Sequence, residues 1–361
     1  MIMQDEVENP RMTYVLDRGQ YDSPIKDKVI PAGVPAALGQ VPDEAPANRL
    51  GLARWLTDPA HPLTSRVAVN RLWAMFFGTG IVKTTGDFGN QGEWPSHPQL
   101  LDWLAVDFTE NGWDLKRTIK QIVTSDAYRR SSASTPELLE ADPENRLLAR
   151  GPRFRLHAEF IRDNALAVSG LLVPTIGGPG VKPYQPANIW NEVSLNGGLR
   201  YPQDKGEKLY RRSMYTYWKR SAPMPSMLIF DVPTREMCSV QRPRTNTPLQ
   251  ALVTLNDPQF VEAARVLAER LIKEGGETTD SRIDLAFRLV TARHPNPREI
   301  EILKNTLALQ REKFEADTAR ADAFLKVGES KRDGSIDPVE HASWTVIAQM
   351  VLNLDESVTR G

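Results

Sequence analysis

Apolar residues recur every three or four positions over much of the chain, which is the period of an amphipathic helix. Between residues 48 and 170 this pattern occurs in five segments, and its clearest example is SHPQLLDWLAVDFTENG. There Leu104 and Phe108 repeat four residues apart, Ser96 is a candidate N-cap and Pro98 falls in the first turn. We therefore predict a helical layer over residues 48–170.

The same period returns after residue 246, where proline opens most of the helices. Thr247 and Asp257 each stand before a proline, so we expect the Thr247 hydroxyl and the Asp257 carboxylate to accept a hydrogen bond from an early backbone N–H. A second helical layer over residues 246–356 is predicted, with helices at Pro248 to Leu255, Pro258 to Lys273, Arg282 to Ala292, Pro297 to about Leu325, and Pro338 to Leu354.

Three other segments lack the helical period. Residues 1–46 are dense in proline and glycine and predict an extended arm, and residues 171–208 predict a long ordered loop. YRRSMYTYWKR alternates large apolar or aromatic residues with polar ones, which is typical of a strand, and it can pair with SMLIF across the turn SAPMP. We expect a small antiparallel β element at about 209–230 within the loop and sheet region 171–245.

The predicted fold is therefore mainly α: a multi-helical single body over residues 47–361 with a small β element and long ordered loops. One body is favoured over two domains because the helices on either side of the central loop each need a partner to bury their apolar faces. The 361 residues with 40% hydrophobic content are enough for a substantial core.

Charge and hydropathy exclude several classes of partner. The 45 Lys and Arg residues nearly balance the 46 Asp and Glu residues, so no global field draws the chain to nucleic acid or an acidic membrane. No apolar run approaches the roughly 20 residues needed to span a bilayer. The N-terminus lacks the layout of a signal peptide, which taken alone predicts a cytoplasmic protein. An anion site in this chain would therefore have to be local.

Local motifs give no support to several common chemistries. The single cysteine, Cys238, excludes an internal disulfide and covalent haem attachment, and we expect it to be a small packed residue. The five histidines show no zinc-binding spacing. Serine-hydrolase, nucleotide and dinucleotide motifs do not occur. We predict no cofactor in this chain.

The loop TTGDFGNQGEWPSHP carries the candidate catalytic residues, Asp87 and His97. Its glycines allow close ligand approach, and the loop delivers polar groups to a helix start, where exposed N–H groups favour an anion. The structural alternative is that the glycines serve tight turns while Asp87 and His97 hydrogen-bond the loop to itself.

A cluster of arginine and aromatic residues is the candidate ligand-binding site. Such side chains on one face can stack on a sugar ring or bracket a sulfate or carboxylate. Alternatively, the aromatic rings are buried and the charges pair with Asp231 and Glu236. The candidates are Arg212, Trp218, Arg220, Arg242, Arg244 and Asn246.

Two carboxylates lie four residues apart on a predicted helix, in HAEFIRDNA. Glu159 and Asp163 repel each other unless a cation lies between them. A bound Ca²⁺ is one such cation, and a neighbouring arginine, such as Arg162, Arg153 or Arg155, is another. The salt bridge is the favoured interpretation, so no metal site is predicted beyond this alternative.

Several long strings resemble one family. They are RLGLARWLTDPAHPLTSRVAVNRLWAMFFGTGIVKTTGDFGNQGEWPSHPQLLDWLA, RRSMYTYWKRSAPMPSMLIFDVPTREMCSVQRPRTNTPLQALVTLNDPQFVEAAR and VLNLDE. The chain, from about Tyr14 to Glu356, resembles the domain of unknown function at the C-terminus of planctomycete-type, cytochrome-c-linked secreted proteins. This resemblance carries no established activity.

The resemblance says more about the longer protein to which this chain would belong than about a reaction that it could catalyse. In that family a signal peptide, often a cytochrome-c-like domain, and another domain come first, and TYVLDRGQYDSP is similar to the stretch between domains. We therefore expect a C-terminal fragment of a periplasmic or secreted parent. Haem c is implied only for its missing upstream part, and those upstream domains are the expected protein partners.

Two hypotheses of function follow. The first is an extracytoplasmic module that binds or acts on polysaccharide or acidic ligands, with enzymatic activity left open. The second is a non-catalytic structural or interaction scaffold. They differ in one observable: under the first, Asp87, His97, Arg212, Arg244 and Asn246 line one open pocket, and under the second they are scattered or satisfied internally.

Overall fold

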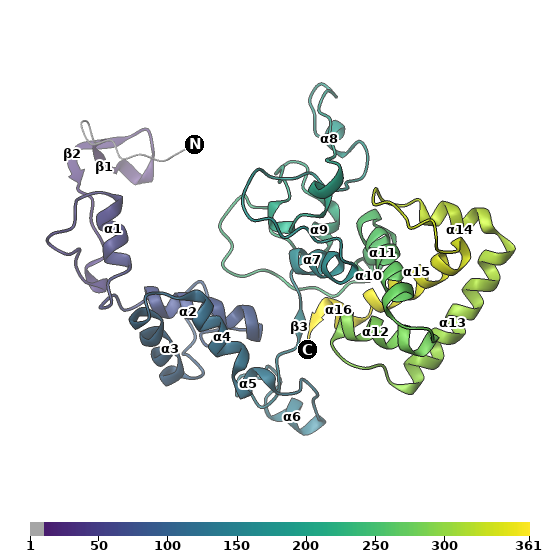
Figure 1. The fold of residues 1–361 in the computed structure, drawn as a ribbon. Helices are drawn as coiled ribbons and strands as arrows, with labels where there is room; N and C mark the ends of the chain where they lie inside the picture. The colour runs from purple at the N-terminus through teal and green to yellow at the C-terminus, as the bar shows by residue number, and fades with distance from the viewer. Residues whose placement is uncertain (1–10) are drawn as a thin grey trace. The chain divides into compact units, whose positions relative to one another are not determined.

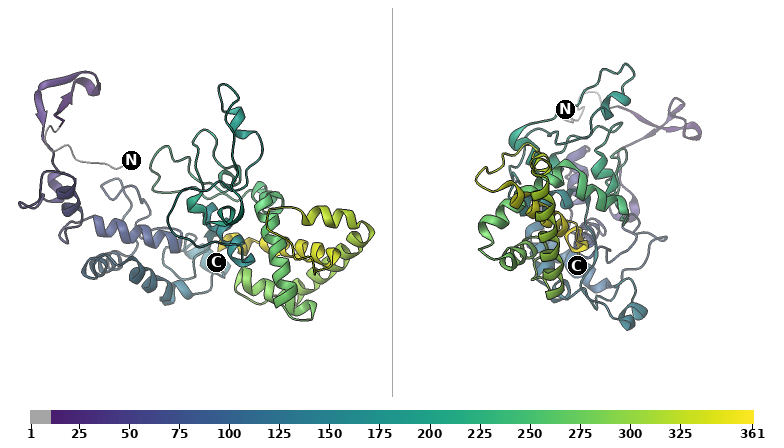
Figure 2. Two further views of the ribbon diagram at one scale, coloured as in Figure 1. Left: turned by 45° about the horizontal axis from the view of Figure 1, so that its top comes forward. Right: turned by 90° about the vertical axis from the view of Figure 1, so that its right-hand side faces the viewer.

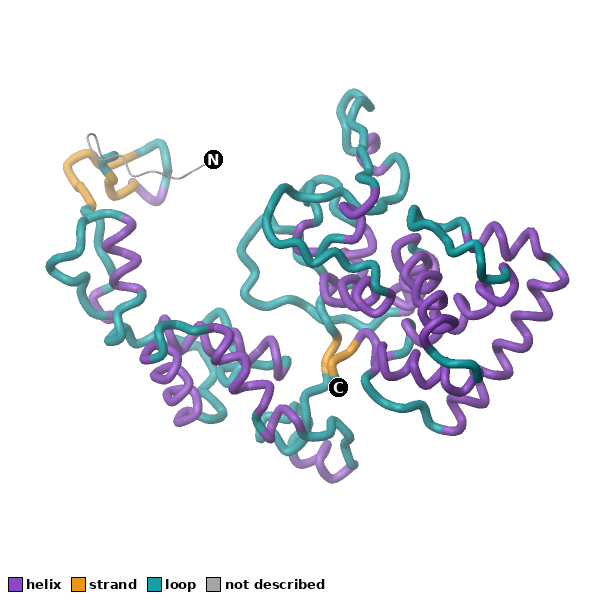
Figure 3. Tube along the Cα trace, viewed as in Figure 1, coloured by secondary structure: helices purple, strands orange, loops and turns teal. Residues whose placement is uncertain are grey.

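A computed structural model describes residues 11–361, and α-helices account for most of its regular structure (Figure 3). Contacts divide the chain into two compact units, Met1–Pro152 and Arg153–Gly361. This division differs from the single body predicted after residue 46. Its physical reason is that every hydrophobic cluster of the described chain lies within one unit. The boundary also divides the predicted layer 48–170, because the helix Ala158–Ser169 packs in the second unit.

The first unit begins with a two-stranded antiparallel sheet, formed by β1 and β2, inside the segment predicted as an extended arm. Trp73 and Phe77 of α2 stack with ring centroids 4.0 Å apart, and Leu104 and Phe108 of α3 complete the same buried cluster. The elements are β1 Thr13–Leu16, β2 Pro24–Ile30, α1 Arg49–Leu56, α2 Thr64–Phe77, α3 Pro98–Glu110, α4 Leu115–Thr124, α5 Asp126–Arg129 and α6 Pro136–Ala141 (Figure 1). The helices predicted here are confirmed.

The predicted cap of α3 is wrong. His97, not Ser96, is the N-cap residue, and its side chain makes no capping hydrogen bond. The Ser96 backbone N–H donates instead to the carbonyl of Ile81, 3.0 Å away, which ties the preceding loop back to the end of α2.

The second unit is built around α11 and α15, which lie side by side in Figures 1 and 2. The predicted helix from Pro297 to Leu325 divides at Asp317, whose carboxylate caps the second part by accepting from the Arg320 N–H. The helices are α7 Ala158–Ser169, α8 Ile189–Glu192, α9 Pro225–Ile229, α10 Pro248–Asn256, α11 Pro258–Glu274, α12 Thr279–Thr291, α13 Pro297–Ala316, α14 Thr318–Leu325, α15 Pro338–Leu352 and α16 Asp355–Val358. A two-residue strand pair, β3 Phe154–Arg155 and β4 Thr359–Arg360, joins the two ends of this unit.

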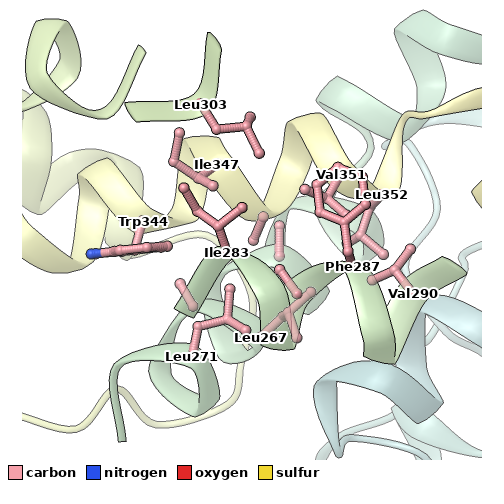
Figure 4. Close-up of a cluster of buried hydrophobic side chains, with 14 of the residues drawn as sticks. Leu267, Leu271, Ile283, Phe287, Val290, Leu303, Trp344, Ile347, Val351 and Leu352 are labelled. Carbon is pink, nitrogen blue, oxygen red and sulfur yellow. The ribbon is translucent and has the colours of Figure 1, made fainter. Parts of the chain in front are cut away.

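The main core of the second unit lies between α11, α12 and α15 (Figure 4). Leu267, Ile283, Trp344 and Ile347 are fully buried there. The Trp344 indole N–H donates to the Glu340 carboxylate at 2.8 Å, so this large ring is buried without an unmet donor. Across residues 11–361 no helix is both long and apolar enough to span a bilayer.

The β element predicted at about 209–230 is wrong. The segment forms two short 3₁₀ helices, Gly206–Tyr210 and Ser213–Tyr215, followed by α9. Its only strand-like contacts within the described chain are isolated bridges of Arg211 with Val173 and of Thr216 with Val181. Apolar and polar residues do alternate in this segment. However, side chains of α7 form hydrogen bonds with the backbone N–H and C=O groups that would otherwise pair with a neighbouring strand.

Arg162 of α7 makes most of these contacts and is only 4% exposed. Its guanidinium donates to the carbonyl of Leu209 at 2.6 Å, to the carbonyl of Arg211 at 2.9 Å and to the Ser213 hydroxyl at 3.1 Å. Its Nε donates to Gln259 on α11. Burial lowers the pKa of Arg162 to about 10, which still leaves the guanidinium charged at neutral pH.

We expect Arg162→Met to destabilise the second unit by about 3–5 kcal/mol, because it leaves buried carbonyl groups without a donor. Urea unfolding followed by circular dichroism would measure the change. Arg298→Met is the matched control, since Arg298 is exposed on α13. Equal stability of the two variants would contradict the role given to Arg162.

His341 is a second buried polar group, on the face of α15 that meets α11. Its Nε2–H donates to the carbonyl of Arg265 at 3.0 Å, and Nδ1 has no hydrogen-bond partner in residues 11–361. Burial lowers the pKa of His341, aided by the charges of Arg265 and Arg332, while the Arg265 carbonyl and Glu269 oppose the shift. The histidine is therefore neutral in the folded protein at neutral pH.

This shift makes stability depend on pH in a defined direction. The unfolded chain binds the proton near the ordinary value of 6.5. Stability is thus full above that pH and falls as the pH drops below it, by at most about 1.4 kcal/mol per pH unit, until the folded pKa is reached. Comparing unfolding at pH 8 and pH 5, we expect His341→Gln to lose part of this dependence. His294→Gln, which changes an exposed histidine beside Asp284, should keep the part of the dependence that His341 contributes.

Candidate functional site

The loop before α3 is folded tightly by its own polar groups. The Thr84 hydroxyl donates to the carbonyl of Asp87 at 2.8 Å and accepts from the Glu93 N–H at 3.0 Å. Gly92 passes so close to the carbonyl of Asp87 that a Cβ on it would clash with that backbone oxygen. The glycine is therefore required by a close backbone approach, and the loop can present neighbouring side chains in a fixed arrangement.

This loop and the first turns of α2 and α3 enclose a groove of about 570 Å³. Trp94 is on its rim, 90% exposed, and its ring has no aromatic or cationic neighbour in the described chain. Arg66 and Asp102 form an ion pair in the groove, with Nε and Oδ1 2.7 Å apart. The lining residues are Leu63, Arg66, Val82, Phe88, Gly89, Asn90, Gly92, Glu93, Trp94, Pro95, Pro98, Leu101 and Asp102.

The two candidate catalytic residues do not line this groove. The Asp87 carboxylate accepts from the Gly89 N–H at 2.7 Å, and His97 Nδ1 lies 3.0 Å from the Ser96 hydroxyl. Both contacts are those of the structural alternative, in which the loop is hydrogen-bonded to itself. A catalytic role for either residue stays a prediction. Trp94 was not identified from the sequence as a candidate binding residue, because the sequence does not show whether a single tryptophan is exposed or buried.

In the second unit, the arginines of QRPRTNTP are held by neighbouring side chains. Arg242 pairs with Glu159 of α7 at 2.8 Å, and the Arg244 guanidinium stacks over the Phe154 ring, 4.4 Å from its centroid. Both arginines line a cavity of only about 10 Å³, which leaves room for about one water molecule. Burial lowers the pKa of Arg244, and it lowers that of His157 together with the charges of Arg242 and Arg244.

Thr245 and Asn246 also have protein partners. The Thr245 N–H and hydroxyl donate to the Asp231 carboxylate at 2.6 and 2.8 Å, and the Asn246 carbonyl oxygen accepts from the Arg155 guanidinium. Thr247 is the N-cap residue of α10, but its hydroxyl accepts no capping hydrogen bond, so that prediction is wrong. The Asp257 cap is confirmed, because its carboxylate accepts from the Gln259 N–H at 2.9 Å.

Asn246 lines a pocket of about 190 Å³ at the start of α10, with both polar and apolar residues in its wall. Gln250 is only 3% exposed, and its Oε1 has no hydrogen-bond partner within the described residues. Arg155 Nε is likewise buried there without a partner. The lining residues are Arg155, Phe230, Asn246, Thr247, Gln250, Ala251, Thr254, Asn353, Asp355 and Val358.

The other predicted ligand-binding residues do not join that pocket. The Trp218 indole N–H donates to the carbonyl of Thr234 at 2.9 Å, and the Arg235 guanidinium stacks 4.6 Å from the centre of its ring. Arg212 and Arg220 are exposed. Of the six residues in the predicted cluster, Asn246 alone lines the 190 Å³ pocket.

Glu159 and Asp163 bind different partners. Glu159 pairs with Arg242, whereas Asp163 accepts from the N–H and the hydroxyl of Ser213 at 2.7 and 2.6 Å. Within residues 11–361, no group of three or more His, Cys, Asp or Glu side chains is arranged to hold a metal ion. Cys238 is exposed, so the packed position expected for it is wrong.

Comparison with known proteins gives one result. The family described as PSD1, protein of unknown function (DUF1553), matches residues 48–307, which is more than half of the chain. Comparisons with curated proteins and with solved structures gave no match. The planctomycete lineage and the link to cytochrome c stay predictions from the resemblance. Because this match covers more than half of the chain, the chain belongs to the PSD1 family of proteins of unknown function (DUF1553).

Proposed function

We propose that the groove beside Trp94 binds a neutral polysaccharide. The observation that carries this proposal is the 90% exposure of the Trp94 ring at the rim of a groove of about 570 Å³. A tryptophan ring is highly buried on average, and one that is almost fully exposed at the rim of a groove is available to stack on a ligand. A pyranose ring can stack its C–H face on the indole while its hydroxyl groups reach the groove.

The polar groups of the groove suit hydroxyl groups. Glu93 and Asp102 supply carboxylate acceptors, Arg66 supplies donors, and the Asn90 amide supplies both. Each sugar hydroxyl both donates and accepts, so a mixed set of this kind can serve several of them. Two carboxylates against one guanidinium make the groove slightly acidic, which disfavours an acidic sugar there.

We expect Trp94→Ala to weaken polysaccharide binding about tenfold, since it removes the stacking surface. Affinity gel electrophoresis with soluble β-glucan, xylan and glucomannan would measure retardation of the native protein. Trp103→Ala is the control, because Trp103 is 56% exposed on α3 but does not line the groove. Equal retardation of both variants, or none for the wild type, would favour the scaffold hypothesis instead.

A second candidate ligand, a small anion, is supported by the 190 Å³ pocket in the other unit. Arg155 lines it with an unpartnered Nε, and Arg242 and Arg244 lie in the adjacent cavity, whose wall also includes Arg155. The pocket opens at the N-terminus of α10, where backbone dipoles favour negative charge. Asp355, 3.5 Å from Arg155, offsets part of this positive charge.

For this site we expect glucuronate to raise the melting temperature of the wild type but not of Arg155→Met. The comparison with and without glucuronate separates ligand binding from the intrinsic loss of stability that the substitution causes. Arg288→Met, which changes an arginine 61% exposed on α12, is expected to keep the glucuronate response. A response that survives in Arg155→Met would rule this pocket out.

The cellular location of this protein and its partner domains are inferred from the family resemblance alone. A periplasmic or secreted parent, with upstream haem c domains as partners, is part of the proposal. It fits a polysaccharide ligand because such polymers are encountered outside the cytoplasm.

A further inference from the structure

A third pocket, of about 300 Å³, lies in the long loop of the second unit. It is formed by residues 185–191, which include the start of α8, and by residues 199–203. This loop extends away from the helices of its unit in all three views (Figures 1 and 2). The lining residues are Gln185, Pro186, Ala187, Asn188, Trp190, Asn191, Leu199, Arg200, Tyr201 and Gln203.

Aromatic rings fix the position of Trp190 in this pocket. The Tyr201 ring meets the Trp190 ring edge-on with centroids 5.3 Å apart, and the Tyr217 ring is 5.9 Å away. Lys219 Nζ lies 5.4 Å from the centre of the indole. The Tyr201 hydroxyl donates to the carbonyl of Pro183 at 2.6 Å, which anchors the loop beneath the rings.

Three polar side-chain atoms of this pocket are buried without a hydrogen-bond partner in residues 11–361. They are Gln185 Nε2, Trp190 Nε1 and Asn191 Oδ1, and all three side chains line the pocket. Leaving such an atom unpaired costs about 1–3 kcal/mol. Three of them within seven residues mark a place where a ligand can supply the missing partners.

We propose that this pocket binds the acetamido group of an N-acetylated sugar. The pocket offers two unmet donors, Gln185 Nε2 and Trp190 Nε1, and one unmet acceptor, Asn191 Oδ1. A secondary amide has the complementary set, since its carbonyl oxygen accepts two hydrogen bonds and its N–H donates one. The rings of Trp190 and Tyr201 supply an apolar surface for the methyl group.

The rest of the lining favours a sugar over a peptide as the source of that amide. Asn188, Arg200 and Gln203 stand beside the aromatic rings and can hydrogen-bond to ring hydroxyl groups. No carboxylate lines the pocket and Arg200 is its one charged lining residue, so a sugar that carries a free, positively charged amine is disfavoured there. A peptide held by strand addition would need an exposed strand edge, and the pocket residues form no strand.

This proposal does not rest on polysaccharide binding at Trp94, because the two sites share no residue and belong to different units. A variant of one site should therefore leave the other intact. Failure of either proposal can be recognised without reference to the other.

Calorimetric titration of the full chain with tri-N-acetylchitotriose tests the proposal. We expect binding to the wild type, and at least about tenfold weaker binding to Trp190→Phe, which keeps a ring but removes the N–H donor. Asn191→Leu, which removes the acceptor, should have a similar effect and serves if Trp190→Phe does not fold. Trp103→Ala, which changes an exposed tryptophan that lines neither pocket, is the control and should bind as the wild type does.

Two further probes separate the possible sources of binding. Chitosan trimer, which has free amines in place of the acetamido groups, should not bind. N-acetylalanine methylamide carries the same amide without a sugar and should bind far more weakly than the trisaccharide. Equal binding of chitosan trimer, tighter binding of the peptide probe, or unchanged affinity in both pocket variants would overturn the proposal.

Discussion

The arrangement of the second unit depends on the burial of one charge, the guanidinium of Arg162. A charge removed from water has to regain its hydrogen bonds from the protein. Arg162 obtains them from the carbonyls of Leu209 and Arg211 and from side chains on neighbouring segments. The segment that supplies these carbonyls is thereby held in short 3₁₀ turns against α7. A loop that would otherwise be mobile becomes a fixed wall of the unit.

The same principle recurs on α11. Glu262 and Arg265 are both buried on this helix, and they hold the segment after α14. The Ser330 N–H donates to Glu262 at 2.6 Å, and Arg265 donates to the carbonyl of Ser330 at 2.7 Å. The Tyr210 hydroxyl donates to the same carboxylate at 2.9 Å, and burial together with Glu262 raises the pKa of Tyr210 to about 12. One face of α11 thus packs in the apolar core while another anchors loops by charge.

Loops held in this way can carry binding groups on a rigid support, which is the usual arrangement of functional sites. The three tryptophans of the candidate sites show how differently similar residues are used. Trp218 has its N–H and its ring satisfied by the protein, Trp94 has its ring in solvent, and Trp190 has its ring packed but its N–H unpaired. Only the second and third arrangements leave binding capacity for a ligand.

The sequence by itself determined the longer helices. Their apolar residues repeat at the helical period over several turns, and so long a repeat is a strong local signal. The Asp257 cap was predictable for a similar reason, because it acts within one turn of its helix. The mainly α class followed from these elements alone.

Tertiary structure decided what the local pattern left open. The alternation at residues 209–219 predicted a strand, yet Arg162 and Asp163, some fifty positions away in sequence, took the hydrogen bonds that a strand needs. Arg242 and Asn246 had suggested a ligand, and partners far away in sequence, Glu159 and Arg155, satisfied them. Exposure of Trp94 and of Cys238 was likewise invisible in the sequence. A polar or aromatic side chain can stabilise the fold or remain available to a ligand. Contacts between segments that are distant in sequence decide between the two, and those contacts exist only once the chain has folded.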